Sequence, residues 1–145
     1  MIYWDTSALV KLYVAEPDSP YFLALAEETE QQIVTSAIAT TEVLCALYGM
    51  EHRRVLKRGG ARRIHEEFLS DSQTGRIVTI PYGPDIAREA TKLVELASVQ
   101  PTGFLVRSLD AIHVASAMIS KTAFVVATDG RLRRAAELMG LKLRP

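Results

Sequence analysis

The chain has 145 residues, of which 48% are hydrophobic and 23% are charged, as in an ordinary globular domain. Seventeen lysines and arginines balance seventeen aspartates and glutamates, so the overall charge argues neither for nor against a nucleic-acid partner. This composition excludes disordered, collagen-like and low-complexity proteins.

Short β-branched or aromatic runs alternate with longer helical patterns along the chain. The expected strands are residues 2–4, 33–35, 77–80 and 124–126, with a weak edge strand at 141–143. The expected helices lie near residues 7–13, 20–31, 39–51, 60–72, 84–98, 109–120 and 131–139. Strands so uniformly apolar are typical of a parallel sheet that is covered on both faces. The alternation predicts one α/β domain over residues 1–145, with a small parallel sheet of four to five strands and about seven helices.

The cysteine and histidine content limits the chemistry and the compartment. A single cysteine, Cys45, can form neither an internal disulfide nor a cysteine-based zinc site. The three histidines show no HxH or HxxxH spacing, which argues against a histidine-ligated metal. The first residues have no basic region of a signal peptide, and no apolar run approaches the ~20 residues that span a bilayer. We therefore expect a reduced, cytoplasmic protein without a membrane segment.

Four acidic residues are expected to meet at one edge of the predicted sheet. Asp5 follows the first strand and Asp129 follows the fourth, and parallel strands end at the same edge, where ligands of open α/β sheets bind. Asp110 lies in the first turn of an otherwise apolar helix, for which Ser108 is the expected N-cap. Glu42 lies near the start of another apolar helix.

Each of these acids also has a purely structural interpretation. A carboxylate in the first helical turn gains ~0.3–1 kcal/mol from the helix dipole, which alone could explain Glu42 or Asp110. Asp129 precedes Gly130 and could be a turn or cap residue. Asp5 is the hardest to explain in this way, because the apolar residues on both sides of it predict burial.

Taken together, the four acids indicate a cation site. Close carboxylates repel one another by about 1 to 4 kcal/mol per pair, so either some stay protonated or a cation holds them. A set of oxygen ligands without histidine or cysteine suits Mg²⁺ or Mn²⁺ rather than zinc. Because such ions usually bind together with a phosphate, the pattern favours phosphoryl chemistry.

Four segments carry a family resemblance: DTSALVKLY at 5–13, TEV at 41–43, LDAIHVA at 109–115 and TDGRL at 128–132. In order and spacing they resemble the PIN domain family, and most closely the VapC-type toxins of bacterial and archaeal type II toxin–antitoxin pairs. The resemblance extends from one end of the chain to the other. It implies a three-layer α/β/α fold around the small parallel sheet.

The resemblance also implies an activity and a site. Members of the family are Mg²⁺- or Mn²⁺-dependent endoribonucleases, in which the acids orient and deprotonate a water for attack on an RNA phosphodiester, leaving 5′-phosphate and 3′-hydroxyl ends. Asp5, Glu42, Asp110 and Asp129 match the catalytic, metal-binding acids by position. Thr6 and Ser7 are the expected supporting residues, with the Ser7 hydroxyl fixing a carboxylate or a metal-bound water.

The resemblance implies partners as well, and the chain departs from the family pattern at one point. The implied partners are RNA as substrate, a second copy in a homodimer, and a cognate antitoxin with a segment that covers the site. The family often has a threonine two residues before the last aspartate, where this chain has Ala127 and the threonine, Thr128, comes one residue later. We therefore expect the Thr128 hydroxyl to point away from the site.

Basic residues are concentrated between positions 53 and 63, which hold six lysines and arginines and no acid. The candidate RNA-binding residues here are Arg53, Arg54, Lys57 and Arg58, because each contact with a phosphate adds salt-dependent affinity. Arg107, three residues before Asp110, is a further candidate for a phosphate contact. The alternatives for the basic run are a solvated surface or a site for a protein partner.

Other conspicuous residues favour structural roles. His113 shares a helix face with Asp110, and a packed, hydrogen-bonded histidine is a better expectation there than a general acid. Cys45 is expected to be a small buried apolar residue. Tyr3 and Trp4, within the first strand, are expected in the core or an interface.

Three other functions compete with a nuclease. A catalytically degenerate PIN-like domain would bind RNA or protein without cutting it, although all four acids are present. A response-regulator receiver needs paired acids after its first strand and a late catalytic lysine, and neither occurs. A haloacid-dehalogenase-type phosphatase needs Asp-x-Asp after the first strand, whereas Ser7 takes the place of the second acid.

Overall fold

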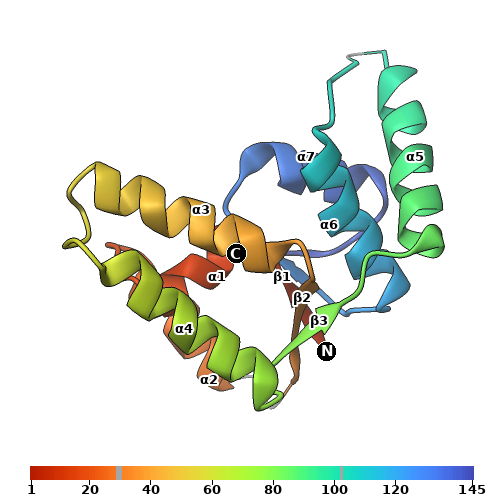
Figure 1. The fold of residues 1–145 in the computed structure, drawn as a ribbon. Coiled ribbons are helices and arrows are strands. Elements are labelled where there is room, and N and C mark those ends of the chain that lie inside the picture. The colour runs from red at the N-terminus through yellow and green to blue at the C-terminus, as the bar shows by residue number, and fades with distance from the viewer. Residues whose placement is uncertain (29–30, 102) are drawn as a thin grey trace.

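The fold is built on a five-stranded, all-parallel sheet. The computed structural model describes residues 1–28, 31–101 and 103–145, and counts below refer to these residues. The strands are β1 (Ile2–Trp4), β2 (Ile33–Ser36), β3 (Ile77–Ile80), β4 (Val125–Val126) and β5 (Leu143–Arg144). Their order across the sheet is β3-β2-β1-β4-β5, with β1 in the centre. Figure 1 labels β1, β2 and β3 next to one another. The predicted parallel sheet is confirmed, with the fifth strand two residues later than expected.

Helices of regular length connect the strands. They are α2 (Ser19–Glu28), α3 (Ala39–His52), α4 (Gly60–Gln73), α5 (Pro84–Ser98), α6 (Ser108–Ile119) and α7 (Gly130–Leu138). The helix expected at 7–13 is instead a short α1 (Thr6–Leu9) followed by a 3-10 turn, η1 (Val10–Leu12). Residues 29–30 of the helix expected at 20–31 lie outside the described residues.

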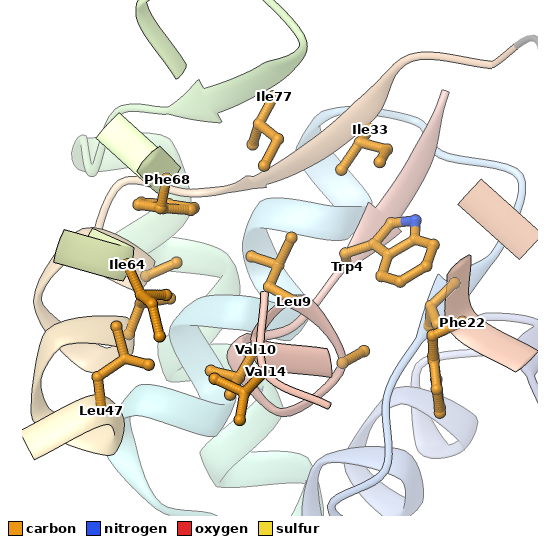
Figure 2. Packing of buried hydrophobic residues seen from close by; sticks show 14 of the residues in the cluster. Trp4, Leu9, Val10, Val14, Phe22, Ile33, Leu47, Ile64, Phe68 and Ile77 are labelled. Atoms are coloured by element: carbon orange, nitrogen blue, oxygen red, sulfur yellow. The ribbon is translucent and has the colours of Figure 1, made fainter. Parts of the chain in front are cut away.

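Side chains alternate along β1 and divide the core between the two faces of the sheet. Ile2 and Trp4 pack into one cluster, with α1, α2, α3 and α4, and Figure 2 shows Trp4 beside Phe22 in it. Tyr3 enters the second cluster, with α5, α6 and α7, on the opposite face. Two helical layers thus enclose one sheet, which is the expected three-layer α/β/α arrangement.

Two sequence-based expectations fail at the periphery. The strands were predicted to be buried on both faces, but β3 is an edge strand and its Val78 is 37% exposed, because only β2 pairs with it. Ser108 was the expected N-cap of α6, but it is the first helical residue and Arg107 takes the cap position. Arg107 has the extended backbone of a cap residue without a capping side-chain hydrogen bond.

The strand order places a switch point beside β1. The chain extends the sheet from β1 through β2 to β3 on one side, and then returns to add β4 and β5 on the other. In open α/β sheets the crevice at the carboxyl ends of the strands opens where the direction of winding reverses. Here that point lies between β1 and β4, where Asp5 and Asp129 follow the strands. Within the described residues, no helix is both long and apolar enough to cross a membrane.

Candidate functional site

The four predicted acids line one cavity of about 630 Å³. They come from four separate parts of the chain: Asp5 from the end of β1, Glu42 from α3, Asp110 from α6 and Asp129 from the segment between β4 and α7. The expectation that these side chains meet at the carboxyl edge of the sheet is therefore correct. The apolar side chains of Val10, Ala46, Met50, Leu109 and Leu132 complete much of the wall.

Asp5 is the most deeply buried of the four and is held on both carboxylate oxygens. It is 3% exposed and serves as the N-cap of α1, with Oδ1 accepting from the Ala8 amide at 2.9 Å. The Ser7 hydroxyl donates to both carboxylate oxygens at 2.8 Å. Burial raises the pKa of Asp5 to about 6, although the bonds from Ala8 and Ser7 oppose that rise. This carboxyl group therefore ionises at a cost to the fold.

The pKa of Glu42 is shifted in the opposite direction to that of Asp5. Its Oε2 accepts from the Thr6 hydroxyl at 2.7 Å and lies 2.6 Å from His113 Nε2. Burial works against ionisation, but the hydrogen bond and charge interaction with His113, together with Thr6, lower the pKa of Glu42 below its ordinary value. Glu42 is thus a carboxylate at neutral pH and is oriented by two donors.

Asp110 lies close enough to Asp129 to be affected by its charge. Asp129 is the N-cap of α7, and its Oδ1 accepts from the amides of Arg131 and Leu132 at 2.8 and 3.2 Å. Burial raises the pKa of Asp110, and the charge of Asp129 raises it further. The Oδ2 atom of Asp110 is buried without a hydrogen-bond partner in the described part of the chain. Such an orphaned oxygen in an acidic pocket fits a cation ligand.

One oxygen each of Glu42 and Asp129 accepts no hydrogen bond from the described residues. Within the described residues, hydrogen bonds reach Oε2 but not Oε1 of Glu42, and Oδ1 but not Oδ2 of Asp129. No three His, Cys, Asp or Glu side chains among those residues stand close enough to hold a metal directly. Mg²⁺ normally keeps several waters and uses one or two protein carboxylates. The carboxylates of this cavity therefore fit a hydrated hard cation.

Two positive side chains lie at the cavity. The Lys11 ammonium is already bound by Glu16 and Asp18, at 2.5 and 2.7 Å, and is thereby held in an ion-pair network of its own. Arg107 is exposed at the cavity wall and opposes the rise in the pKa of Asp110. Of the five candidate RNA-binding residues, Arg107 is therefore the one that lies in the same cavity as the four acids.

Two expectations about neighbouring residues are wrong. Thr128 was expected to point away, but its hydroxyl donates to Ser7 Oγ at 2.8 Å and its amide donates to the same oxygen at 3.0 Å. Ser7 thereby links Thr128 to Asp5. Cys45 was expected to be buried, but it is exposed and lines the cavity, because it follows Glu42 by almost one helical turn.

The other candidate RNA-binding residues lie away from the acids. Arg53, Arg54, Lys57 and Arg58 belong to the basic turn, residues 53–58, that joins α3 to α4. With Tyr48 they line a second hollow that shares no residue with the acidic cavity. Within the described residues none of these four cations forms an ion pair, whereas Arg62 and Arg63 pair with Glu66 and Glu67 on α4.

Sequence reasoning missed how the polar neighbours connect the acids. His113 was expected to be packed and hydrogen-bonded, and it is 2% exposed, but its partners, Tyr3 and Glu42, could not be named. Tyr3 was placed in the core, which is correct, but without its bond to His113. The odd position of Tyr3 between Ile2 and Trp4 was the available signal, because it sends the ring to the opposite face from its neighbours.

Comparison with known proteins agrees with this architecture. The family model described as PIN domain matches residues 2–138. No curated protein sequence matches the chain. Among solved structures, FitAcB from Neisseria gonorrhoeae superposes with a TM-score of 0.72 at 17% identity, covering 100% of this chain and 97% of that chain.

Two further solved structures have the same fold. VapBC2 from Rickettsia felis, solved with a DNA fragment from the promoter, has a TM-score of 0.69 at 20% identity and covers 99% of this chain and 98% of that one. VapC20 from Mycobacterium tuberculosis, described as a toxin that cleaves the sarcin–ricin loop, also has a TM-score of 0.69, at 17% identity, with 93% and 95% covered. At these identities the likeness establishes the fold.

We predict that replacing Asp5 stabilises the metal-free protein at neutral pH. Because burial raises the pKa of this carboxyl to about 6, the folded chain favours its protonated form, and stability falls as the pH rises through that value. In EDTA at pH 7.5, Asp5→Asn should raise the free energy of unfolding on the order of 1–3 kcal/mol. By pH 4 the gain should largely vanish, as urea denaturation at both pH values would measure.

The matched control is Asp85→Asn, the same substitution at an exposed position on α5. Asp85 lies in the first turn of α5 and pairs with Arg88, so its replacement should lower the stability at pH 7.5 by roughly 0.3–1 kcal/mol rather than raise it. An Asp5→Asn protein that is less stable than the unmodified chain at pH 7.5 would contradict the assigned cost of ionising Asp5.

Proposed function

The chain belongs to the PIN domain family, and from this membership and its acidic cavity we propose that it is a Mg²⁺- or Mn²⁺-dependent endoribonuclease, the toxin of a type II toxin–antitoxin pair. The reaction is the hydrolysis of RNA phosphodiester bonds. Residues 1–145 are proposed to form one PIN domain, since the family match spans nearly the whole chain.

The observation that carries the proposal is the convergence of Asp5, Glu42, Asp110 and Asp129 on one cavity at the switch point of the sheet. A pocket this acidic repels an RNA phosphate, so an anionic substrate can enter only with cations between the two sets of oxygens. The four carboxylates offer only oxygen atoms as metal ligands, which favours Mg²⁺ or Mn²⁺.

Each acid has a separate role in this proposal. Glu42, Asp110 and Asp129 offer carboxylate oxygens to the cation, while Asp5 is fixed by Ser7 at the base of the site. A divalent ion, when bound, lowers the pKa of a water and neutralises charge on the phosphate oxygens. Thr6 orients Glu42, and Ser7 orients Asp5, so that both hydroxyls act through their carboxylates.

RNA binding is proposed to extend from the cavity to the basic turn. Arg107 at the cavity wall is placed for a phosphate beside the cleavage point. Arg53, Arg54, Lys57 and Arg58 lack ion-pair partners among the described residues and are therefore available to phosphates further along the strand. The half-exposed ring of Tyr48 beside them suits stacking of an unpaired base.

A cognate antitoxin is the proposed regulator of this activity. Support comes from the structural neighbours, which include a toxin–antitoxin complex from Klebsiella pneumoniae and VapBC2. The apolar wall formed by Val10, Ala46 and Met50 gives a peptide segment a surface beside the acids. The proposed location is the cytoplasm, where RNA is available and a lone cysteine such as Cys45 stays reduced.

A homodimer is also proposed, with a surface on the connection between α5 and α6. Leu105 and Val99 are 93% and 75% exposed, more than any other large apolar side chain among the described residues. The Phe104 ring next to Leu105 lies under the Arg134 guanidinium, 4.2 Å away, which anchors this connection to α7. Exposed apolar groups on an anchored segment favour a protein contact.

We predict metal-dependent cleavage of RNA that requires Asp5. Purified protein should cut total RNA with Mg²⁺ or Mn²⁺, and EDTA should abolish the cleavage. Loss of a group that merely supports a metal ligand costs about 10–100-fold, so Asp5→Asn is expected to cost at least that much. Gel electrophoresis of RNA over time measures the rates, and Asp85→Asn is the matched control that should retain full activity.

Three outcomes would contradict the assignment in different ways. Cleavage at an undiminished rate in Asp5→Asn would place the active site elsewhere or indicate a contaminating nuclease. Cleavage that continues in EDTA would exclude the proposed metal. Binding of RNA without cleavage in either metal would favour the catalytically degenerate PIN-like module instead.

We predict that the basic turn contributes salt-dependent RNA affinity. Combined reversal, Arg53→Glu with Arg54→Glu, should weaken binding and flatten the dependence of log K on log salt by roughly 0.7 for each lost contact with single-stranded RNA. Fluorescence anisotropy over a salt series measures both. Arg88→Glu with Lys92→Glu on α5 makes the same change in net charge and should alter neither, whereas equal effects of the two pairs would rule out a local site.

We predict that Leu105 lies in the dimer interface. Light scattering after size-exclusion chromatography should give a dimeric mass for the unmodified chain and a monomeric mass for Leu105→Lys, because a buried unpaired charge is costly. Val55→Lys changes another exposed apolar residue, on the basic turn, and should remain dimeric. If the Leu105→Lys protein is dimeric, the dimer interface lies on another surface. If the unmodified chain is monomeric, the proposed homodimer is wrong.

A further inference from the structure

A buried hydrogen-bonded chain connects the sheet to the acidic cavity. The Tyr3 hydroxyl lies 2.7 Å from His113 Nδ1, and His113 Nε2 lies 2.6 Å from Glu42 Oε2. Tyr3 and His113 are 0% and 2% exposed, so water does not compete for these bonds. Three elements are thereby joined through the interior, β1 by Tyr3, α6 by His113 and α3 by Glu42.

Hydrogen-bond chemistry fixes the direction of this chain. An ionised carboxylate only accepts hydrogen bonds, so Nε2 of His113 carries the hydrogen that it shares with Glu42. When the imidazole is neutral, Nδ1 carries no hydrogen and accepts from the Tyr3 hydroxyl, whereas a charged imidazolium would donate from both nitrogens. Burial raises the pKa of Tyr3, and its hydroxyl therefore keeps the proton that it donates.

The contacts fix the Glu42 carboxylate through one of its two oxygens. Thr6 donates to the same oxygen, Oε2. No hydrogen bond from the described residues reaches Oε1, the second oxygen of the carboxylate. A glutamate fixed in this way has given up its rotamer freedom before a ligand arrives, and it still has one oxygen to offer.

We propose that His113, backed by Tyr3, is a positioning residue that preorganises the Glu42 carboxylate for a divalent cation. The role rests on the proposed metal-dependent function and acts through Glu42, since the contacts of His113 are with Tyr3, Thr6 and Glu42. Partners in this position fix the orientation of metal ligands in other proteins and raise metal affinity.

The test compares two substitutions of His113 with a packing control. His113→Leu removes the donor but keeps an apolar side chain, whereas His113→Gln keeps an N–H group that can reach Glu42. Val114→Ala removes packing at the adjacent, buried position without touching Glu42. Electron paramagnetic resonance of free Mn²⁺ measures the affinity for Mn²⁺ alone, and initial rates over an RNA concentration series separate kcat from KM.

The expected pattern separates positioning from general stability. His113→Leu should weaken Mn²⁺ binding by roughly 10–100-fold and lower kcat with little change in the KM for RNA. His113→Gln should recover most of both losses. Val114→Ala should lower the Tm while leaving Mn²⁺ affinity and kcat unchanged.

The tautomer gives a second readout that needs neither metal nor a variant. A two-bond ¹H–¹⁵N spectrum of the metal-free protein should show the hydrogen of His113 on Nε2. A hydrogen on Nδ1 alone would overturn the proposal. Because this measurement uses the unmodified chain, it remains valid even if the His113→Leu protein does not fold.

The failures of the two proposals are distinguishable. A parent chain that binds no Mn²⁺ and cuts no RNA would overturn the proposed function and this inference together. If the unmodified chain binds Mn²⁺ and cuts RNA, and the folded His113→Leu protein has the same Mn²⁺ affinity, only the positioning role is overturned.

Discussion

The repulsion among carboxylates at the end of β1 is the constraint on which the rest of the site depends. Burial raises the pKa of Asp5 and of Asp110, and the charge of Asp129 raises both further. A fold selected for stability alone would separate these groups. Their convergence is therefore best explained by a ligand whose charge is opposite to theirs.

The surrounding polar groups reduce that cost selectively. Asp5 is held through Ser7, Ser7 is held by Thr128, and Glu42 is held by Thr6 and His113. Asp110 is left with a buried oxygen that no described residue satisfies. A fully satisfied network would stabilise the protein without need of a ligand, whereas this one is complete at the base of the cavity and open where a cation would enter.

The elements and the acidic set could be predicted because they depend on local patterns. Apolar runs fix the strands, and the position of Asp5 and Asp129 after two parallel strands places both at one edge. Thr128 could not be predicted, because its contact with Ser7 joins residues far apart in sequence and depends on how β1 and β4 align. Cys45 was misjudged because residue type predicts burial only on average, while its place on α3 decides which way it faces.

The exposed face of β3 and the break between α1 and η1 could not be predicted from the apolar pattern. An apolar sequence cannot tell a central strand from an edge strand, because strand order is a property of the whole sheet. Asp5 caps the start of α1, where Ser7 and Ala8 donate to its carboxylate. The apolar run continues from α1 into η1, and an apolar pattern does not distinguish a 3-10 turn from a further turn of α-helix.

The separation of the acidic cavity from the basic turn is consistent with the proposed anionic polymer as substrate. Helix α3 connects the two, with Glu42 in its first turn and Arg53 directly after its last residue. Eleven residues at 1.5 Å each place them roughly 16 Å apart along the axis. An acidic site repels RNA until cations bind, and a chain with no net charge has no general attraction to supply. Attraction must then come from a local surplus of positive charge, near enough to guide the strand and far enough to leave the carboxylates free for a cation.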